Sequence, residues 1–81
     1  MSVSLLYITC GSLDEAREIG RTLVGERLAA CANILDGMRS LYWWDGELRE
    51  DSEVVLIAKT RDALVEAVTE RVRALHSYTV P

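Results

Sequence analysis

One histidine and two cysteines supply the nitrogen and sulfur ligands that copper and zinc prefer in this sequence of 81 residues. His76 is its only histidine and lies at the end of a predicted helix, where the imidazole can either bind a metal or cap the negative helix end. Cys31 is a soft donor that suits copper, but a cysteine among small apolar residues more often belongs to a core. Cys10 is the weaker thiol candidate, because it lies 21 residues before Cys31 with no CxxC pair between them. We therefore take His76 and Cys31 as candidate metal ligands, and a single histidine would need further ligands from other subunits.

Lys59 is the only lysine beside eight arginines, and it follows the apolar residues 54–58. A lysine partly removed from water there could hold an anion. Its aliphatic stem could also lie along the strand and leave the ammonium group in water, which the sequence alone favours. Trp44 and Tyr78 are candidates for lining the same ligand pocket, although aromatic side chains also concentrate at protein interfaces.

No group of residues predicts catalysis. The sequence has no P-loop, no glycine-rich phosphate loop and no recognisable serine, histidine and acid arrangement. The acidic residues of segment 47–53 could attract cations, but a solvated strand face that discourages edge pairing explains them more simply. We expect a binding protein and not an enzyme.

Composition excludes several classes of protein. The formal net charge is -4 and the basic residues are scattered, which argues against nucleic-acid binding. Apolar residues make up 49% of the chain, but no apolar run approaches the roughly 20 residues of a membrane span. The first ten residues have no basic segment before their apolar run, so they do not resemble a secretory signal. The expected compartment is the cytoplasm, without membrane association.

The first elements that must position these residues are a strand and a helix. Residues 3–10 are apolar on both alternating faces, which predicts a central strand covered on both sides. Ser12 and Glu15 form a capping box at the start of a helix that ends near Glu26 or Arg27. Its predicted buried face consists of apolar residues at helical spacing: Ala16, Ile19, Gly20, Leu23 and Val24.

Residues 30–60 alternate with a period of two and contain two turn dipeptides. Asp45-Gly46 is the predicted hairpin tip, whereas Asp36-Gly37 becomes a bend or bulge within one long strand. The predicted cross-strand pairs are Trp44 with Glu47, Trp43 with Leu48, Leu35 with Leu56, and Ile34 with Ile57.

A second helix is predicted after the hairpin, capped by Thr60 and with Asp62 near its amino end. Its buried stripe is Leu64, Val68, Val72 and Leu75, and residues 78–80 are extended again. This order indicates an α+β, ferredoxin-like (βαββαβ) fold, an antiparallel sheet with two helices on one face. We expect one domain over residues 1–81 whose final strand is missing from the sequence, which leaves residues 3–10 with an open edge.

Four segments resemble motifs of the CutA family of divalent-cation tolerance proteins. They are residues 28–34 (LAACxN), 40–48 (SxYxWxG), 53–60 (ExxLxxKT) and 75–81 (LHPYxxP), in order and at compatible spacing. Ser77 departs from the usual proline, which loosens the backbone beside His76, and Thr79 stands where an acidic or polar residue is common. The resemblance implies a ferredoxin-like homotrimer linked to tolerance of divalent metals, with copper binding, and structural similarity to the PII nitrogen-regulatory trimers.

These observations lead to a predicted function and two alternatives. The prediction is a non-enzymatic trimer that binds copper or another divalent cation weakly, with His76 and Cys31 nearest the metal. The first alternative is a PII-like signalling trimer that binds a small anionic ligand in clefts between subunits, through Lys59, Trp44 and Tyr78. The second is a scaffold whose assembly is itself the function.

The long hairpin predicts the assembly. An arm of 11 residues, 34–44, is roughly 36 Å long, whereas a first helix of about 14 residues covers only about 21 Å. The uncovered end carries an apolar patch that a monomer rarely leaves in water: Leu41, Tyr42, Trp43, Trp44 and Leu48. We expect Tyr42, Trp43, Trp44 and Leu48 to contact a neighbouring copy in a ring, which the resemblance implies is a homotrimer.

Overall fold

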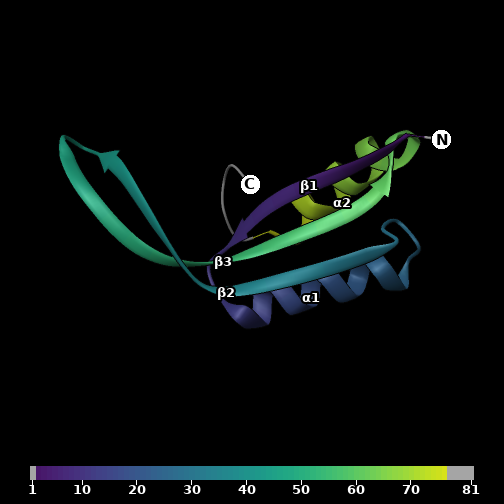
Figure 1. Cartoon of the computed structure of the whole chain (residues 1–81), viewed down its shortest axis with the longest axis horizontal. Coiled ribbons are helices and arrows are strands. Elements are labelled where there is room, and N and C mark those ends of the chain that lie inside the picture. Colours follow the sequence, from purple (N-terminus) through teal and green to yellow (C-terminus); the bar gives the residue numbers. More distant parts are fainter. Residues whose placement is uncertain (1, 77–81) are drawn as a thin grey trace.

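The computed structural model describes residues 2–76, which form one antiparallel sheet and two α-helices (Figure 1). The elements are β1 (Val3–Cys10), α1 (Leu13–Gly25), β2 (Cys31–Trp44), β3 (Glu47–Arg61), the 3-10 turn η1 (Asp62–Leu64) and α2 (Val65–Leu75). The predicted α+β class and order of elements are confirmed. The extended segment predicted at residues 78–80 lies outside the described residues. No helix within residues 2–76 is long and apolar enough to cross a membrane.

Both helices pack on the same face of the sheet. The strand order is β1-β3-β2, so β3 is the central strand. The core lies between this face and the helices, and its buried residues include Ile8, Cys10, Ala16, Ile19, Leu23, Val54, Leu56, Ala58, Val68 and Val72. Val24, predicted to be buried, is 40% exposed because it lies at the edge of this face.

Helix α1 begins with the predicted capping box. The Ser12 hydroxyl accepts the N–H of Glu15 at 3.1 Å. The Glu15 carboxylate bonds back to the N–H of Gly11, also at 3.1 Å, one residue earlier than in the usual box. The Glu15 side chain is thereby held against the end of β1.

The same helix ends in a Schellman motif. The N–H of Arg27 bonds to the Val24 carbonyl at 3.0 Å, and the N–H of Leu28 bonds to the Leu23 carbonyl at 2.9 Å. Arg27 takes the left-handed position of this motif, with φ 61°, where glycine is usual. The helix end is therefore close to the predicted residue, but it contains a strained arginine.

The hairpin is confirmed, with one correction to its register. Asp45 and Gly46 both have positive φ (52° and 76°), as a type I′ turn requires, and the tip pairs are those predicted. The register shifts between Leu35 and Met38, where two residues oppose one on β3. The predicted base pairs were therefore wrong by one residue: Leu35 faces Val55, and Ile34 faces Leu56.

Among the described strands β1 lies at the edge of the sheet, as expected for residues 3–10, but the prediction that both of its faces are covered was wrong. Among the described elements it pairs only with β3. Val3, Leu5 and Tyr7 point to the face without helices and are 55%, 68% and 66% exposed. Both helices lie on the opposite face, so no element within residues 2–76 covers these apolar side chains.

The start of the second helix also differs from the prediction. Thr60 lies within β3 and is buried, and its hydroxyl donates to the Leu28 carbonyl at 2.6 Å instead of capping a helix. The chain turns through η1, and the N-cap residue of α2, Leu64, makes no side-chain cap hydrogen bond. The predicted stripe is otherwise correct, since Val68 and Val72 are buried.

Candidate functional site

His76 lies at the C-cap of α2 and is buried. Its N–H bonds to the Val72 carbonyl at 2.8 Å, which completes the last helical turn. Its ring Nε2 lies 2.5 Å from the carbonyl oxygen of Thr9 on β1. Because a carbonyl only accepts, Nε2 carries a proton in this arrangement. The ring therefore connects the end of α2 to the end of β1.

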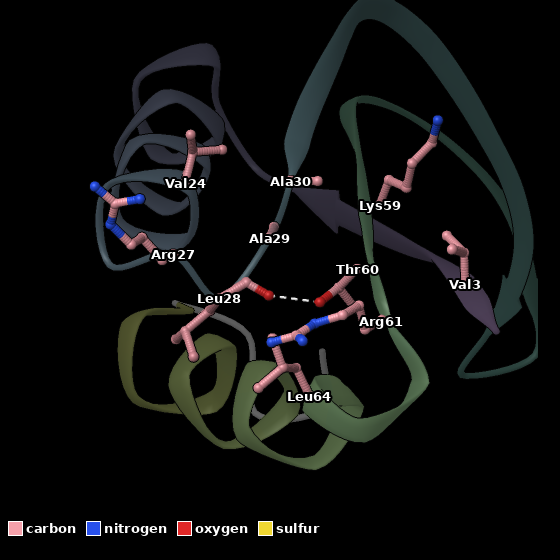
Figure 2. Close-up of a pocket in the computed structure, with 10 residues that line it drawn as sticks. All are labelled: Val3, Val24, Arg27, Leu28, Ala29, Ala30, Lys59, Thr60, Arg61 and Leu64. Carbon is pink, nitrogen blue, oxygen red and sulfur yellow. Dashed lines mark hydrogen bonds between the residues drawn. The ribbon is translucent and has the colours of Figure 1, made fainter. Parts of the chain in front are cut away.

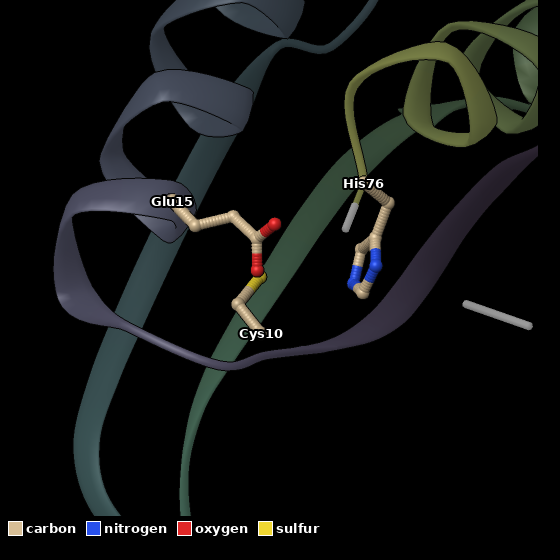
Figure 3. Close-up of side chains that lie close together, drawn as sticks. All are labelled: Cys10, Glu15 and His76. Carbon is tan, nitrogen blue, oxygen red and sulfur yellow. The ribbon is translucent and has the colours of Figure 1, made fainter. Parts of the chain in front are cut away.

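Three potential metal ligands converge next to this ring: Cys10 from the end of β1, Glu15 from the first turn of α1, and His76 (Figure 3). One ligand atom from each lies within 4.8 Å of the others. Ligands around a tetrahedral ion with bonds of 2.0 to 2.3 Å are about 3.5 Å apart, so binding requires a contraction of about 1 Å. Among residues 2–76 the cluster offers a thiol, a carboxylate and an imidazole, which are three ligands for an ion that binds four.

The electrostatic environment keeps the Cys10 thiol protonated when no cation is bound. Burial raises the pKa of this thiol to about 11, and the nearby Glu15 and Glu53 carboxylates add to the increase because they disfavour a further negative charge. A cation bound at this place must displace the thiol proton. The positive charge of the ion would offset the cost of burying the thiolate and its repulsion by Glu15 and Glu53. A thiolate at Cys10 is therefore more stable with a bound cation than without one.

The structure does not bring Cys31 to His76 within one chain. Cys31 pairs with Lys59 on β3, whereas Cys10 pairs with Val54. Five residues of β3 separate these positions by about 17 Å, and their side chains point to opposite faces of the sheet. The thiol beside His76 is therefore Cys10, which the sequence had ranked below Cys31.

Sequence reasoning also missed Glu15 as a potential ligand, although a signal was present. The capping box places Glu15 in the first turn of α1, only five residues after Cys10 and directly beyond the end of β1. Combining the strand end with the helix cap would have placed these two side chains together. Their proximity to His76 depends on how α2 packs against β1.

Lys59 lies at the edge of a pocket formed at the other end of the sheet (Figure 2). The pocket lies between the end of α1, the α1–β2 connection and the end of β3, and its volume is about 570 Å³. Trp44 does not contribute to it, because its partner Glu47 lies 12 positions before Lys59 on β3, a length of about 40 Å. Tyr78, the third predicted ligand-binding residue, lies outside the described residues.

The predicted interface residues lie at the tip of the arm, which curves away from the helices (Figure 1). Leu41, Trp43, Trp44 and Leu48 are 66%, 73%, 64% and 63% exposed. Tyr42 is 36% exposed, and its hydroxyl donates to Asp51 on β3, which raises the pKa of the phenol. Within the described chain the apolar tip has no cover.

Comparison with known proteins identifies the family. The family model described as CutA1 divalent ion tolerance protein matches residues 4–81. The chain belongs to this CutA1 family. A CutA1-family relative, the divalent-cation tolerance protein CutA of Thermus thermophilus, is 49% identical over 77 residues, which cover 95% of this chain and 75% of that protein. Mouse protein CutA is 47% identical over 79 residues, 98% of this chain and 45% of that protein.

Solved structures of the CutA1 family have the same fold. The Thermus thermophilus structure superposes with a TM-score of 0.92 at 48% identity, covering 99% of this chain and 78% of that one. The Xylella fastidiosa CutA structure superposes with a TM-score of 0.95 at 42% identity, covering 100% of this chain and 78% of that one. The chain spans about half the length (44–52%) of the rice, mouse, human and Xenopus CutA relatives.

Proposed function

We propose that this protein serves divalent-cation tolerance by binding the cation without catalysis, at Cys10, Glu15 and His76. The observation that carries the proposal is the convergence of these three ligand types within 4.8 Å, in a chain of the CutA1 divalent ion tolerance family. Two of the three residues come from elements next to each other in sequence, and the third closes the site from the end of α2.

The donor set favours copper among divalent cations. A thiolate and an imidazole are ligands that copper and zinc accept, and the Irving–Williams order places Cu²⁺ above the other first-row ions for such donors. Binding costs the thiol proton and a contraction of the cluster. If the cation uses Nε2, binding also breaks the His76–Thr9 hydrogen bond, whereas Nδ1 leaves that bond intact. These costs agree with weak, reversible binding, which suits tolerance better than permanent retention.

We also propose that the working form is a homotrimer held by the arm. The exposed tip residues Trp43, Trp44 and Leu48 form an apolar surface that water disfavours, and a second copy of the chain offers the uncovered sheet face of β1 as another. An arm that meets a different surface on its neighbour makes a head-to-tail contact, which closes as a ring. The cytoplasm stays our prediction for its compartment. The PII-like alternative, with an anion in clefts between subunits, stays a prediction that depends on Lys59.

Titration of the metal-free protein with Co²⁺ tests the metal site directly, because a thiolate ligand produces a charge-transfer absorption with this ion. We expect this absorption in the wild type and its loss in Cys10→Ser. Cys31→Ser is the matched control and keeps the signal. An absorption that disappears in Cys31→Ser and persists in Cys10→Ser would reject the assignment.

A further inference from the structure

Strand β3 runs without interruption from the core sheet into the arm, so its alternation assigns each arm residue to one face of the sheet (Figure 1). Leu5 on β1 lies on the face without helices, and its partner Lys59 points to the same side. This helix-free face continues into the arm, where it carries Met38, Ser40, Tyr42 and Trp44 from β2, and Glu47, Arg49, Asp51 and Glu53 from β3.

The opposite face of the arm carries Arg39, Leu41, Trp43, Leu48, Glu50 and Ser52. The side-chain bonds of the arm support this division, because each of them joins residues of the same face. The Tyr42 hydroxyl, for example, donates to Asp51 within the helix-free face. Trp43 and Trp44 therefore lie on different sides of the arm, although they are adjacent in sequence.

The net charge of the arm strands lies on the helix-free face. Three acids and one base stand there, Glu47, Asp51, Glu53 and Arg49, which gives a net charge of -2. The opposite face has one charge of each sign, on Arg39 and Glu50, and no excess. At the other end of the helix-free face, Lys59 makes no ion pair within residues 2–76. One face of the sheet thus has an acidic end and a basic end.

Apolar side chains lie along the same face. Those that are more than half exposed are Val3, Leu5, Tyr7, Leu35 and Trp44. Both helices pack on the other side of the sheet, so no element within residues 2–76 covers these side chains. An uncovered apolar surface that is flanked by charges is typical of a protein interface.

The two ends of this face are locally complementary. Trp44 is the direct cross-strand partner of Glu47, and Leu5 is the direct partner of Lys59. Each pair places a large apolar side chain about 5 Å from a charged one, and the two charges are opposite. The Arg49–Glu47 ion pair is 3.6 Å long and exposed, so Glu47 can exchange this partner for another cation at little cost.

These two pairs cannot meet within one chain. Glu47 lies 12 positions before Lys59 on β3, a length of about 40 Å. A second copy of the chain removes this constraint, because it offers the acidic end of its face to the basic end of the first. Opposite charges favour such a head-to-tail order, since a contact between equal ends would bring like charges together.

We propose that the Trp44–Glu47 pair of one copy docks on the Leu5–Lys59 pair of a second copy. Trp44 packs on Leu5, and Glu47 forms an ion pair with Lys59 across the contact. The inference rests on the homotrimer proposed above and narrows its contact to the helix-free face of the arm. Trp43, on the opposite face, lies outside the centre of this contact.

Sedimentation equilibrium of the wild type, Trp44→Ala and Trp43→Ala tests the choice of face. Trp44→Ala should raise the concentration of half-assembly at least about tenfold, and at least about threefold more than Trp43→Ala does. Circular dichroism should show that both variants are folded, because both rings are more than half exposed. An equal effect of the two variants, or a larger effect of Trp43→Ala, would overturn the proposal.

Exchange of the two charges tests the ion pair. Lys59→Glu and Glu47→Lys should each raise the concentration of half-assembly at least about threefold, and the double variant should recover most of the loss. Glu50→Lys reverses a charge on the opposite face of the arm. As the matched control, it should neither weaken assembly nor restore it in Lys59→Glu. A double variant without recovery, or rescue of Lys59→Glu by Glu50→Lys, would reject the Glu47–Lys59 contact.

The same measurements separate this inference from the trimer on which it rests. A wild type that sediments as a monomer would refute the proposed trimer, and this contact with it. A trimeric wild type that is more sensitive to Trp43→Ala than to Trp44→Ala would leave the trimer standing and refute only the contact proposed here.

Discussion

The imidazole of His76 is hydrogen-bonded to the backbone carbonyl of Thr9, 67 residues earlier in the chain, with Nε2 and the oxygen 2.5 Å apart. This bond joins the C-terminal end of α2 to the edge strand β1 at the place where Cys10 and Glu15 also meet. His76 therefore has a structural role and a proposed ligand role at once. Variants at this position must be examined for folding and for metal binding separately.

His76→Ala should weaken binding of Cu²⁺ or Zn²⁺ at least about tenfold, equivalent to about 1.4 kcal/mol. Affinity in the wild type should decrease as the pH is lowered, because protons compete for the thiol and imidazole ligands. Competition with a chelator of known affinity measures both effects. Circular dichroism should show a folded variant, and an unchanged affinity in that folded protein would exclude His76 as a ligand.

The free energy of unfolding should depend on Cys10 at alkaline pH. The folded-state pKa of about 11 lies above the unfolded value of about 8.5, so the stabilising contribution of the neutral thiol is fully present below pH 8.5 and is lost as the pH rises toward 11. Urea titrations of the metal-free protein across this window should show a steeper loss of stability in the wild type than in Cys10→Ala. Cys31→Ala is the control and should keep the wild-type slope. Parallel curves for the wild type and Cys10→Ala would contradict the assignment.

Thr60→Val should destabilise the fold by about 1 to 3 kcal/mol, because the buried Thr60 hydroxyl is a partner of the Leu28 carbonyl and valine cannot replace it. Thr69→Val is the matched control. The Thr69 hydroxyl bonds to the Val65 carbonyl within α2, and that carbonyl keeps its helical N–H partner, so the loss should be about 0.5 kcal/mol or less. Chemical denaturation of both variants measures the difference. Equal losses of stability in the two variants would contradict the larger contribution expected of the Thr60–Leu28 hydrogen bond.

Replacing Trp43 and Trp44 together by alanine should dissociate the proposed trimer. Truncating an aromatic residue at the centre of an interface costs about 2 kcal/mol or more of binding free energy. Within the described chain the rings of Trp43 and Trp44 are 73% and 64% exposed, so their loss should not disturb the core. Sedimentation velocity measures the assembly directly. A monomeric wild type, or a double variant that still sediments as a trimer, would disprove the proposed role of the arm.

Much of the local structure could be predicted from sequence because its causes lie within a few residues. The Ser12 hydroxyl caps the helix that starts beside it. Asp45 and Gly46 accept the positive φ of the hairpin turn, and the bulge falls where Asp36-Gly37 predicted it. The four motifs were also sufficient to place the chain in its family, which the family model confirmed.

Long-range relationships were decided only by the tertiary structure. A bulge of one residue changed the register of the strand pairs at the base of the hairpin. Thr60 bonds to the Leu28 carbonyl instead of capping a helix, because the packing of α1 against β3 brings that carbonyl within reach of its hydroxyl. The apolar pattern of β1 did not reveal that the described part of the chain leaves one of its faces uncovered, because the pattern shows which residues are apolar and not which element packs against them.

The candidate site shows the same division. The sequence selected His76 by its chemistry, but it paired this residue with Cys31, which lies in a segment that resembles a CutA motif, and not with Cys10. Which thiol approaches the imidazole depends on strand order, on the face to which each side chain points, and on α2 packing back against β1. Those choices depend on burying one shared core, which no short segment of the chain encodes by itself.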